Sequence, residues 1–433
     1  MAVNAGCAPL LVEHAFRHLY GRLVARLSRE FGFHRTESVE DAVQGALMAA
    51  LTAWSRSGAP DSAMAWLYRV ARNRLLDELG RSAQRDVSLH AETGDDGPPV
   101  PVADAALEPP KVRFEGEIAD DELRLLFVCA DEAIPLESQF VLALKILCGF
   151  STREIALRLL TSEENVHKRL ARGRERLRQL APSLETPPLR ALLVRRAAVM
   201  RIVYLLFNEG YSSALPERLI RRELCDEAIR LGHLLAEHPA CGCAEADALL
   251  ALMLLHAARF DARLDGHGGL LLLEEQDRSK WNPRLIAAGV QRLARAGRGE
   301  VFSRYHAEAA VAAAHCLAPS FEHTDWREIV ELYETLERFE PSPLHTLNRA
   351  IALAQWQGPP AGLALLQALK PPAWLSGYYL WDATLGELER RAGDLDAARR
   401  HLRRALDAAP HPAERALIER RLAACDLARS GRP

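Results

Sequence analysis

Apolar residues recur at helical spacing through most of the chain, and this periodicity limits the fold more than any other feature. Between Val39 and Trp54, apolar side chains return every three or four residues, as they do on the buried face of an amphipathic helix. Residues 11–82, 120–180 and those beyond 187 can be assigned to helices in the same way. Alanine, leucine and arginine are plentiful and favour helices. We therefore predict an all-α protein.

One stretch breaks the helical pattern and divides the chain. Residues 86–118 are rich in Asp, Gly and Pro, as in Asp95-Asp96-Gly97-Pro98-Pro99, a composition typical of an acidic linker. A chain of 433 residues has room for about three domains. We predict a helical domain over 1–85, the linker over 86–118, a second helical domain over 119–184 and a helical extension over 185–433.

Two helices are expected in the second half of the first domain. Ser38 with Asp41 is a plausible start for one, and the sequence Ser57-Gly58-Ala59-Pro60 should end it. Asp61 or Ser62 should cap the next helix, which we expect to run to about Gly80. One face of this helix is apolar, and the opposite face carries Arg69, Arg72 and Asn73.

The second domain ends in two capped helices joined by a tight turn. Ser151-Thr152-Arg153-Glu154 has the form of a capping box, and Thr161-Ser162-Glu163-Glu164 repeats that form. The second helix places apolar residues and Gly173 on one side and a set of basic residues on its other surfaces. A short capped helix followed by a long basic helix is typical of a DNA-binding helix-turn-helix.

The extension contains a repeated turn signal. Gly358-Pro359-Pro360 and Gly393-Asp394 lie 35 residues apart and each precedes an apolar helical pattern. Helix-turn-helix repeats of about 34 residues are the tetratricopeptide period. We predict repeats of this type near 326–425.

Several other classes of protein are not supported by the sequence. The net charge of −3 gives no global positive field, so a nucleic-acid site would have to be local. No phosphate loop, nucleophile elbow or zinc-protease motif is present, so no enzymatic activity and no cofactor are predicted. Cys241-Gly242-Cys243 near His238 lacks the spacing of a zinc site. Eight cysteines without a signal peptide and no membrane segment indicate a cytoplasmic protein that does not bind membranes.

Three motifs together resemble bacterial RNA polymerase sigma factors of the extracytoplasmic-function group. Asp41-Ala42-Val43-Gln44 with Trp54 is similar to the helix that binds core polymerase, although many relatives have an acidic residue where this chain has Gly45. The segment from Ala65 to Asp77 is similar to the helix that meets the minus-ten promoter element. The segments Ser151–Ala156 and Val166–Arg172 resemble the helix-turn-helix for the minus-thirty-five element.

The resemblance implies core RNA polymerase and promoter DNA as partners, and it implies site residues. Those for core polymerase are Asp41, Gln44, Leu47, Leu51 and Trp54. Those for DNA are Trp66, Tyr68, Arg69, Arg72, Asn73, Arg74, Asn165, His167, Lys168, Arg169, Arg172 and Arg174. Strand opening is implied for the segment between Trp54 and Trp66.

Beyond residue 187 the chain resembles the subgroup with a long helical C-terminal extension. Segments such as Tyr204–Tyr211 and Leu250–His256 carry this likeness. Repeat helices form concave binding surfaces, so we predict that the extension contacts the polymerase, a regulatory protein or the chain's own N-terminal domains and thereby tunes activity. The resemblance implies such control. A passive extension is the alternative.

Two other functions remain open at this point. A regulator that binds operator DNA without polymerase would explain residues 120–433, but it gives no role to Asp41–Asp77. An enzyme in the extension would use Asn208, Glu209, Tyr211 and His256. The only support for this hypothesis is that these polar residues lie close to apolar runs.

Overall fold

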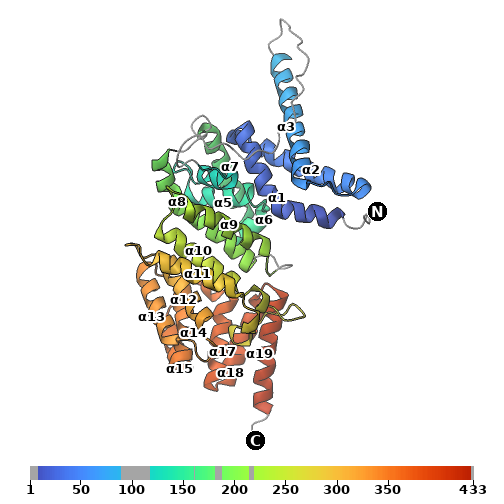
Figure 1. The fold of residues 1–433 in the computed structure, drawn as a ribbon. Helices are drawn as coiled ribbons and strands as arrows, with labels where there is room; N and C mark the ends of the chain where they lie inside the picture. Colours follow the sequence, from blue (N-terminus) through green and yellow to red (C-terminus); the bar gives the residue numbers. More distant parts are fainter. Residues whose placement is uncertain (1–7, 89–117, 160, 181–187, 214–218, 431–433) are drawn as a thin grey trace. The chain divides into compact units, whose positions relative to one another are not determined.

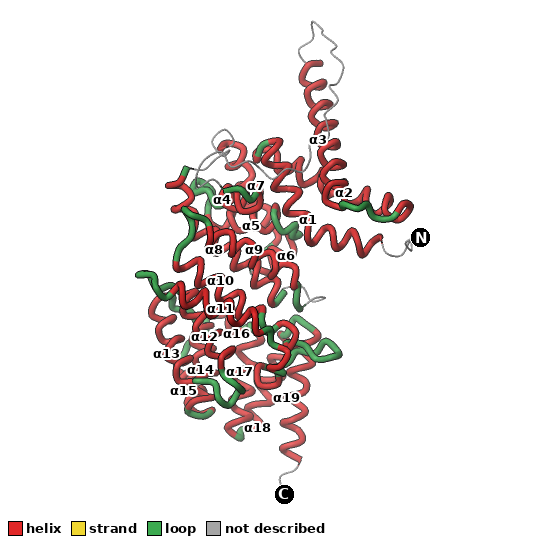
Figure 2. The backbone as a smooth tube through the Cα atoms, viewed as in Figure 1, coloured by secondary structure: helices red, strands yellow, loops and turns green. Residues whose placement is uncertain are grey.

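Helices joined by turns make up the computed structural model, which describes residues 8–88, 118–159, 161–180, 188–213 and 219–430. Figure 2 shows these helices and the loops between them. The one β-type pairing in this described part is an isolated antiparallel bridge between Leu264 and Leu270. The predicted all-α fold is confirmed.

The chain forms two compact units. Unit 1 contains Met1–Leu206 and Asp226–Cys241, and unit 2 contains Phe207–Cys225 and Gly242–Pro433. The division passes through α8 (Leu189–Tyr211) and α9 (Arg222–Glu237). The first helices of the predicted extension therefore contribute residues to the same unit as the two N-terminal domains.

Unit 1 begins with three long helices. They are α1 (Ala8–Phe31), α2 (Thr36–Ser57) and α3 (Ala63–Ser88), with the short 3₁₀ helix η1 (Phe33–Arg35) between α1 and α2. Each of the three helices contributes fully buried apolar side chains to a common core, such as Leu23 of α1, Val43 of α2 and Leu67 of α3. Burial of such side chains stabilises each by roughly 1.5–3 kcal/mol, so the spacing of apolar residues fixes which face of each helix points inward.

The ends of these helices correct two sequence predictions. Helix α2 begins at Thr36 without a side-chain cap, and the Ser38 hydroxyl instead donates to Glu78 Oε1 at 3.0 Å. Ser62 does cap α3, accepting from the amide of Ala65 at 3.2 Å. Helix α3 continues to Ser88 rather than ending near Gly80, since Gly80 is followed by further residues that allow a helix.

The second domain contains α4 (Asp121–Cys129), α5 (Leu136–Ile146), α6 (Thr152–Arg158) and α7 (Glu163–Leu180). The capping box of α6 is confirmed, because Ser151 Oγ accepts from the Glu154 amide and Glu154 accepts from the Ser151 amide. At α7 the cap is Ser162, which accepts from the Asn165 amide at 3.3 Å. The apolar side of α7 is buried at Val166, Leu170 and Leu177. The linker predicted over 86–118 lies, apart from its two ends, outside the described residues.

Unit 2 is a succession of helices that follow one another in space as in the sequence (Figure 1). Helix α10 (Ala244–Ala257) is buried on nearly all sides. The later helices are α11 (Pro283–Ala296), α12 (Arg304–Leu317), α13 (Trp326–Phe339), α14 (Pro343–Trp356), α15 (Pro359–Ala368), α16 (Ala373–Ser376), α17 (Tyr379–Ala392), α18 (Leu395–Ala408) and α19 (Pro412–Ser430). Short 3₁₀ helices η3 (Phe260–Ala262), η4 (Leu273–Glu275) and η5 (Arg278–Lys280) lie between α10 and α11.

The turns spaced 35 residues apart each join two antiparallel neighbours. Gly358 lies between α14 and α15, and Gly393 lies between α17 and α18. Both glycines have positive φ, 95° and 92° respectively, a conformation that a side chain would strain. Each turn therefore starts a new helix at the position that the repeat predicts. None of the helices in the described part of the chain has the length and apolar character needed to cross a membrane.

Candidate nucleic-acid interface

Helix α3 presents a mixed polar and aromatic face to solvent because its other face is buried at Leu67, Ala71 and Leu75. Of the residues predicted to bind DNA on this helix, Arg69, Asn73 and Arg74 are exposed and Trp66, Tyr68 and Arg72 are half-buried. The structure therefore brings all six to accessible positions along one helix.

Glu30 of α1 holds two of these residues in place. The Tyr68 hydroxyl donates to Glu30 Oε2, and Arg72 Nε donates to Glu30 Oε1 at 2.7 Å. The Arg26 guanidinium lies 4.9 Å from the centroid of the Tyr68 ring. Burial and the Glu30 carboxylate raise the pKa of Tyr68, so its hydroxyl stays a hydrogen-bond donor. No local sequence signal points to Glu30, which lies 38 residues before Tyr68.

Two tryptophans fix the turn between α2 and α3. Trp54 and Trp66 meet edge to face with ring centroids 5.6 Å apart, a geometry that stabilises aromatic pairs beyond simple burial. Gly58, between the helices, has a φ of 79° and ends α2. The segment predicted to open DNA strands therefore begins at Trp54 and ends at Trp66, and the rings of these two residues pack against each other.

The predicted polymerase-binding residues on α2 fall into two groups. Asp41 and Gln44 are exposed and Leu51 is half-buried, whereas Leu47 and Trp54 are 6% and 4% exposed. The two buried side chains support the helix from inside and offer little surface to a partner. Met48 is 65% exposed, and it follows Gln44 by four residues, so the helical spacing could have identified it.

The basic helix α7 has an accessible N-terminal half. Lys168 pairs with Glu164 at 2.6 Å and Arg169 pairs with Glu137 at 2.6 Å. Both glutamates are exposed, and exposed ion pairs contribute at most about 1 kcal/mol, so a phosphate could replace them. The exposed members of the predicted set on α7 are Asn165, His167, Lys168 and Arg172.

Arg174 lies in a different environment from the other predicted residues of α7. Its guanidinium pairs with the buried carboxylate of Glu40 and, at 3.1 Å, with Glu37, both on α2. At about 100° per residue, Arg174 lies about half a turn around the helix from Asn165. Burial raises the pKa of Glu40, and Arg174 supplies the cation that a buried carboxylate requires. We therefore do not retain Arg174 among the residues proposed to contact DNA.

Of the four polar residues considered for an enzyme in the extension, Glu209 is buried and Asn208, Tyr211 and His256 are half-buried, all within unit 2. Glu209 is 1% exposed, accepts from the Ser213 hydroxyl at 2.6 Å and lies 3.8 Å from Arg221. The Tyr211 hydroxyl accepts from Arg259 at 3.2 Å, and the Arg263 guanidinium lies 3.7 Å from the centroid of the Tyr211 ring. Burial lowers the pKa of His256 to about 3. These contacts account for Glu209 and Tyr211 as parts of the packing of unit 2.

His238, which was considered with Cys241 and Cys243 for a zinc site, forms hydrogen bonds within its own turn. The His238 imidazole Nδ1 accepts from the backbone amides of Ala240 and Cys241, which closes the turn after α9. Among the described residues, no group of three or more His, Cys, Asp or Glu side chains is arranged to hold a metal ion.

Comparison with known proteins matches three parts of the chain. Residues 16–85 match the Sigma-70 region 2 family, residues 128–177 match Sigma-70, region 4, and residues 195–297 match a family of unknown function, DUF6596. An uncharacterized protein of Rhizobium meliloti (strain 1021) is 38% identical over 399 residues, which cover 90% of this chain and 90% of that protein. No solved structure matches the chain.

Proposed function

Since the chain belongs to the sigma-70 family and carries a C-terminal extension, we propose that it binds core RNA polymerase, recognises minus-ten and minus-thirty-five promoter elements and starts transcription. Sigma-70 proteins form a non-enzymatic family of transcription initiation factors, and the extracytoplasmic-function subgroup is consistent with these matches. The observation that carries the proposal is the pair of accessible polar faces on α3 and α7, each within one of the two matched regions.

Core polymerase would bind the exposed side of α2. Asp41 and Gln44 provide polar groups and Met48 provides an apolar one on neighbouring turns. Methionine adapts its shape to a partner surface. The buried Leu47 and Trp54 would keep the helix rigid beneath this surface.

The minus-ten element would meet α3 and the turn before it. Opening DNA requires a base to leave the stack, at a cost of a few kcal/mol, and aromatic side chains stabilise unstacked bases. Trp66 and Tyr68 are the half-buried aromatic residues at this end of α3. Arg72 is already oriented by Glu30, so a phosphate that displaces Glu30 would find the guanidinium in place.

The minus-thirty-five element would receive the N-terminal half of α7. In a helix-turn-helix the first residues of the second helix contact base edges, and its flanks contact the backbone. Asn165 is suited to a base edge, and Lys168, Arg169 and Arg172 are suited to phosphates or guanine.

The extension would tune this activity through its contacts with the second domain inside unit 1. Arg195 of α8 donates to Glu132 at 3.1 Å and also pairs with the buried Asp131. Arg230 of α9 pairs with Asp120 at 2.7 Å and with Glu122. These contacts support control by the chain's own domains, because a shift of α8 or α9 would leave buried carboxylates without cations.

Run-off transcription from a genomic DNA library, with bacterial core polymerase added, tests the proposal. We expect specific start sites that require the protein, and we expect Asp41→Arg to abolish them. Glu300→Arg, an equal charge change at an exposed position in unit 2, is the matched control and should keep activity. A truncation after Cys241 keeps α8 and α9 and therefore every residue of unit 1. With circular dichroism to verify that its helices remain, it reports whether the rest of the extension is required, inhibitory or passive.

A second outcome would favour an operator-binding regulator. In that case duplex DNA with discrete sites would be bound without polymerase, no core-dependent transcripts would appear, and Asp41→Arg would leave DNA binding unchanged.

A further inference from the structure

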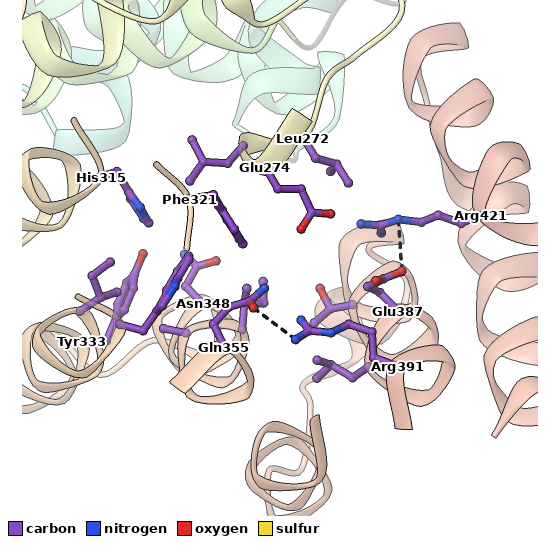
Figure 3. A pocket seen from close by; sticks show the side chains of 17 residues that line it. Leu272, Glu274, His315, Phe321, Tyr333, Asn348, Gln355, Glu387, Arg391 and Arg421 are labelled. Atoms are coloured by element: carbon purple, nitrogen blue, oxygen red, sulfur yellow. Dashed lines mark hydrogen bonds and ion pairs between the residues drawn. The ribbon is translucent and has the colours of Figure 1, made fainter. Parts of the chain in front are cut away.

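A cavity of about 290 Å³ opens within unit 2, between the 3₁₀ helix η4 and helices α13, α14, α17 and α19. This volume is close to the lower end of the range of small-molecule sites, about 300–1,000 Å³. Figure 3 shows His315, Phe321 and Tyr333 on one side of the cavity and Glu387, Arg391 and Arg421 on the other, with Asn348 and Gln355 between them. The cavity therefore has an aromatic end and a charged end.

The aromatic end is built around Trp326. Its ring meets Phe321 edge to face with centroids 5.0 Å apart and meets His315 in the same way at 5.3 Å. Ile351, which also lines the cavity, is 38% exposed, so apolar surface remains available to a ligand. This arrangement presents ring faces and edges to a planar apolar group.

His315 contributes a neutral ring to this end. Burial, with Arg259 and Arg278 nearby, lowers the pKa of His315 to about 3. Its buried Nδ1 has no hydrogen-bond partner among the described residues. Because this atom is inaccessible to solvent, His315 offers the cavity a neutral ring surface rather than a hydrogen-bonding atom.

The charged end holds one guanidinium whose hydrogen bond goes to a neutral group. Glu387 pairs with Arg390 at 2.8 Å and with Arg421 at 3.5 Å. Arg391, by contrast, donates to the neutral amide oxygen of Gln355 at 3.2 Å. A guanidinium forms stronger hydrogen bonds with a carboxylate than with an amide. Of the two carboxylates that line the cavity, Glu387 is paired and Glu274 is exposed on η4, so Arg391 is the group beside which an anionic ligand group would bind.

We propose that this cavity binds a small aromatic carboxylate, with its ring against Phe321, Trp326 and Tyr333 and its carboxylate on Arg391. The ligand would be the signal through which the extension tunes transcription, and this consequence rests on the function proposed above. Binding itself does not depend on that function. The cavity lies wholly within unit 2, and all its lining residues come from the extension.

Isothermal calorimetry with the full-length chain tests the site. The probes are sodium phenylacetate, 4-hydroxyphenylacetate and indole-3-acetate at concentrations up to about 5 mM, the range of weak specific binding. Each acid is compared with its own primary amide, which has the same ring without the charge. We expect at least one acid to bind and its amide to bind at least about tenfold more weakly.

Two variants identify the residues that carry binding. Arg391→Gln should weaken binding of the acid about tenfold to a hundredfold, and Trp326→Leu should weaken both the acid and its amide. Arg327→Gln is the matched control, because Arg327 is exposed next to Trp326 and does not line the cavity. Circular dichroism of each variant verifies that the helices remain. No binding by any acid, equal binding by acid and amide, or an unchanged affinity in Arg391→Gln would overturn the site.

Run-off transcription with and without the best acid separates the site from its regulatory role. A changed transcript yield that is lost in Arg391→Gln supports both. Binding without a change in transcription overturns the regulatory role and leaves the site established.

Discussion

The guanidinium of Arg230 lies 2.7 Å from the carboxylate of Asp120, which precedes it by 110 residues. The same guanidinium pairs with Glu122 and Glu227. Glu122 is 6% exposed, and burial raises its pKa well above the ordinary value. Arg230 thus joins α9 of the extension to α4 of the second domain at a carboxylate that could not remain charged there alone.

Arg230→Ala is expected to destabilise unit 1 by about 3 kcal/mol, because the buried Glu122 loses its main cation and must either keep its charge at a cost or take up a proton. Arg22 retains a longer contact with Glu122 at 3.7 Å. Urea unfolding followed by tryptophan fluorescence measures the loss. Arg222→Ala is the control on the same helix, since Arg222 forms an exposed pair with Asp261, and it should cost less than about 1 kcal/mol. Equal losses in the two variants would contradict the buried pair.

A double-mutant cycle between Arg174 and Glu40 should show strong coupling. Glu40 is 2% exposed and its carboxylate pairs with Arg174, so we expect a coupling free energy above about 1 kcal/mol. The comparison cycle uses Arg178 and Glu37, whose side chains are half exposed, and should give below about 0.5 kcal/mol. Thermal unfolding of Arg174→Met, Glu40→Gln and the double variant provides the values. Coupling near zero at Arg174 would mean that the two helices do not form this contact in solution.

Gly173→Ala should destabilise the second domain, because a Cβ at this position would lie 2.6 Å from Leu142 Cδ1. Overpacking of this kind typically costs about 1–3 kcal/mol. Gly80→Ala is the opposite case, since nothing lies within 4 Å of a Cβ there. In the interior of α3 this change should stabilise the protein by about 0.5–1 kcal/mol. Unfolding midpoints of the two variants should therefore move in opposite directions.

His256 should make unit 2 less stable in acid. Its pKa is lowered from 6.5 to about 3 in the folded protein, so the unfolded chain binds a proton that the folded chain does not between these values. Stability is full above pH 6.5 and falls as the pH decreases towards 3, by up to about 1.4 kcal/mol per pH unit. His256→Gln should reduce the slope of unfolding free energy against pH by this amount. An unchanged slope between pH 4 and 6 would show that the imidazole is solvated.

The sequence determined the features of this protein that depend on residues close together in the chain. The α6 capping box, the turns at Gly58, Gly358 and Gly393, and the apolar sides of α3 and α7 follow from hydrogen bonds and spacing within about four residues. Helical geometry also separates Arg174 from Asn165, although the sequence prediction grouped them together. The sigma-70 motifs are of the same local kind, so the amino-acid sequence alone is enough to identify them.

Only the tertiary structure decided which polar side chains meet across elements. Glu30 and Tyr68, Arg174 and Glu40, and Arg230 and Asp120 are separated by 38, 134 and 110 residues, and no local pattern links the members of each pair. The structure also placed Leu47 and Trp54 on the buried side of α2 and left Met48 at its surface. The packing of helices that are distant in the sequence decides which side chains are buried. Burial in turn decides whether a charged side chain needs an oppositely charged partner and which helix faces remain exposed to bind another molecule.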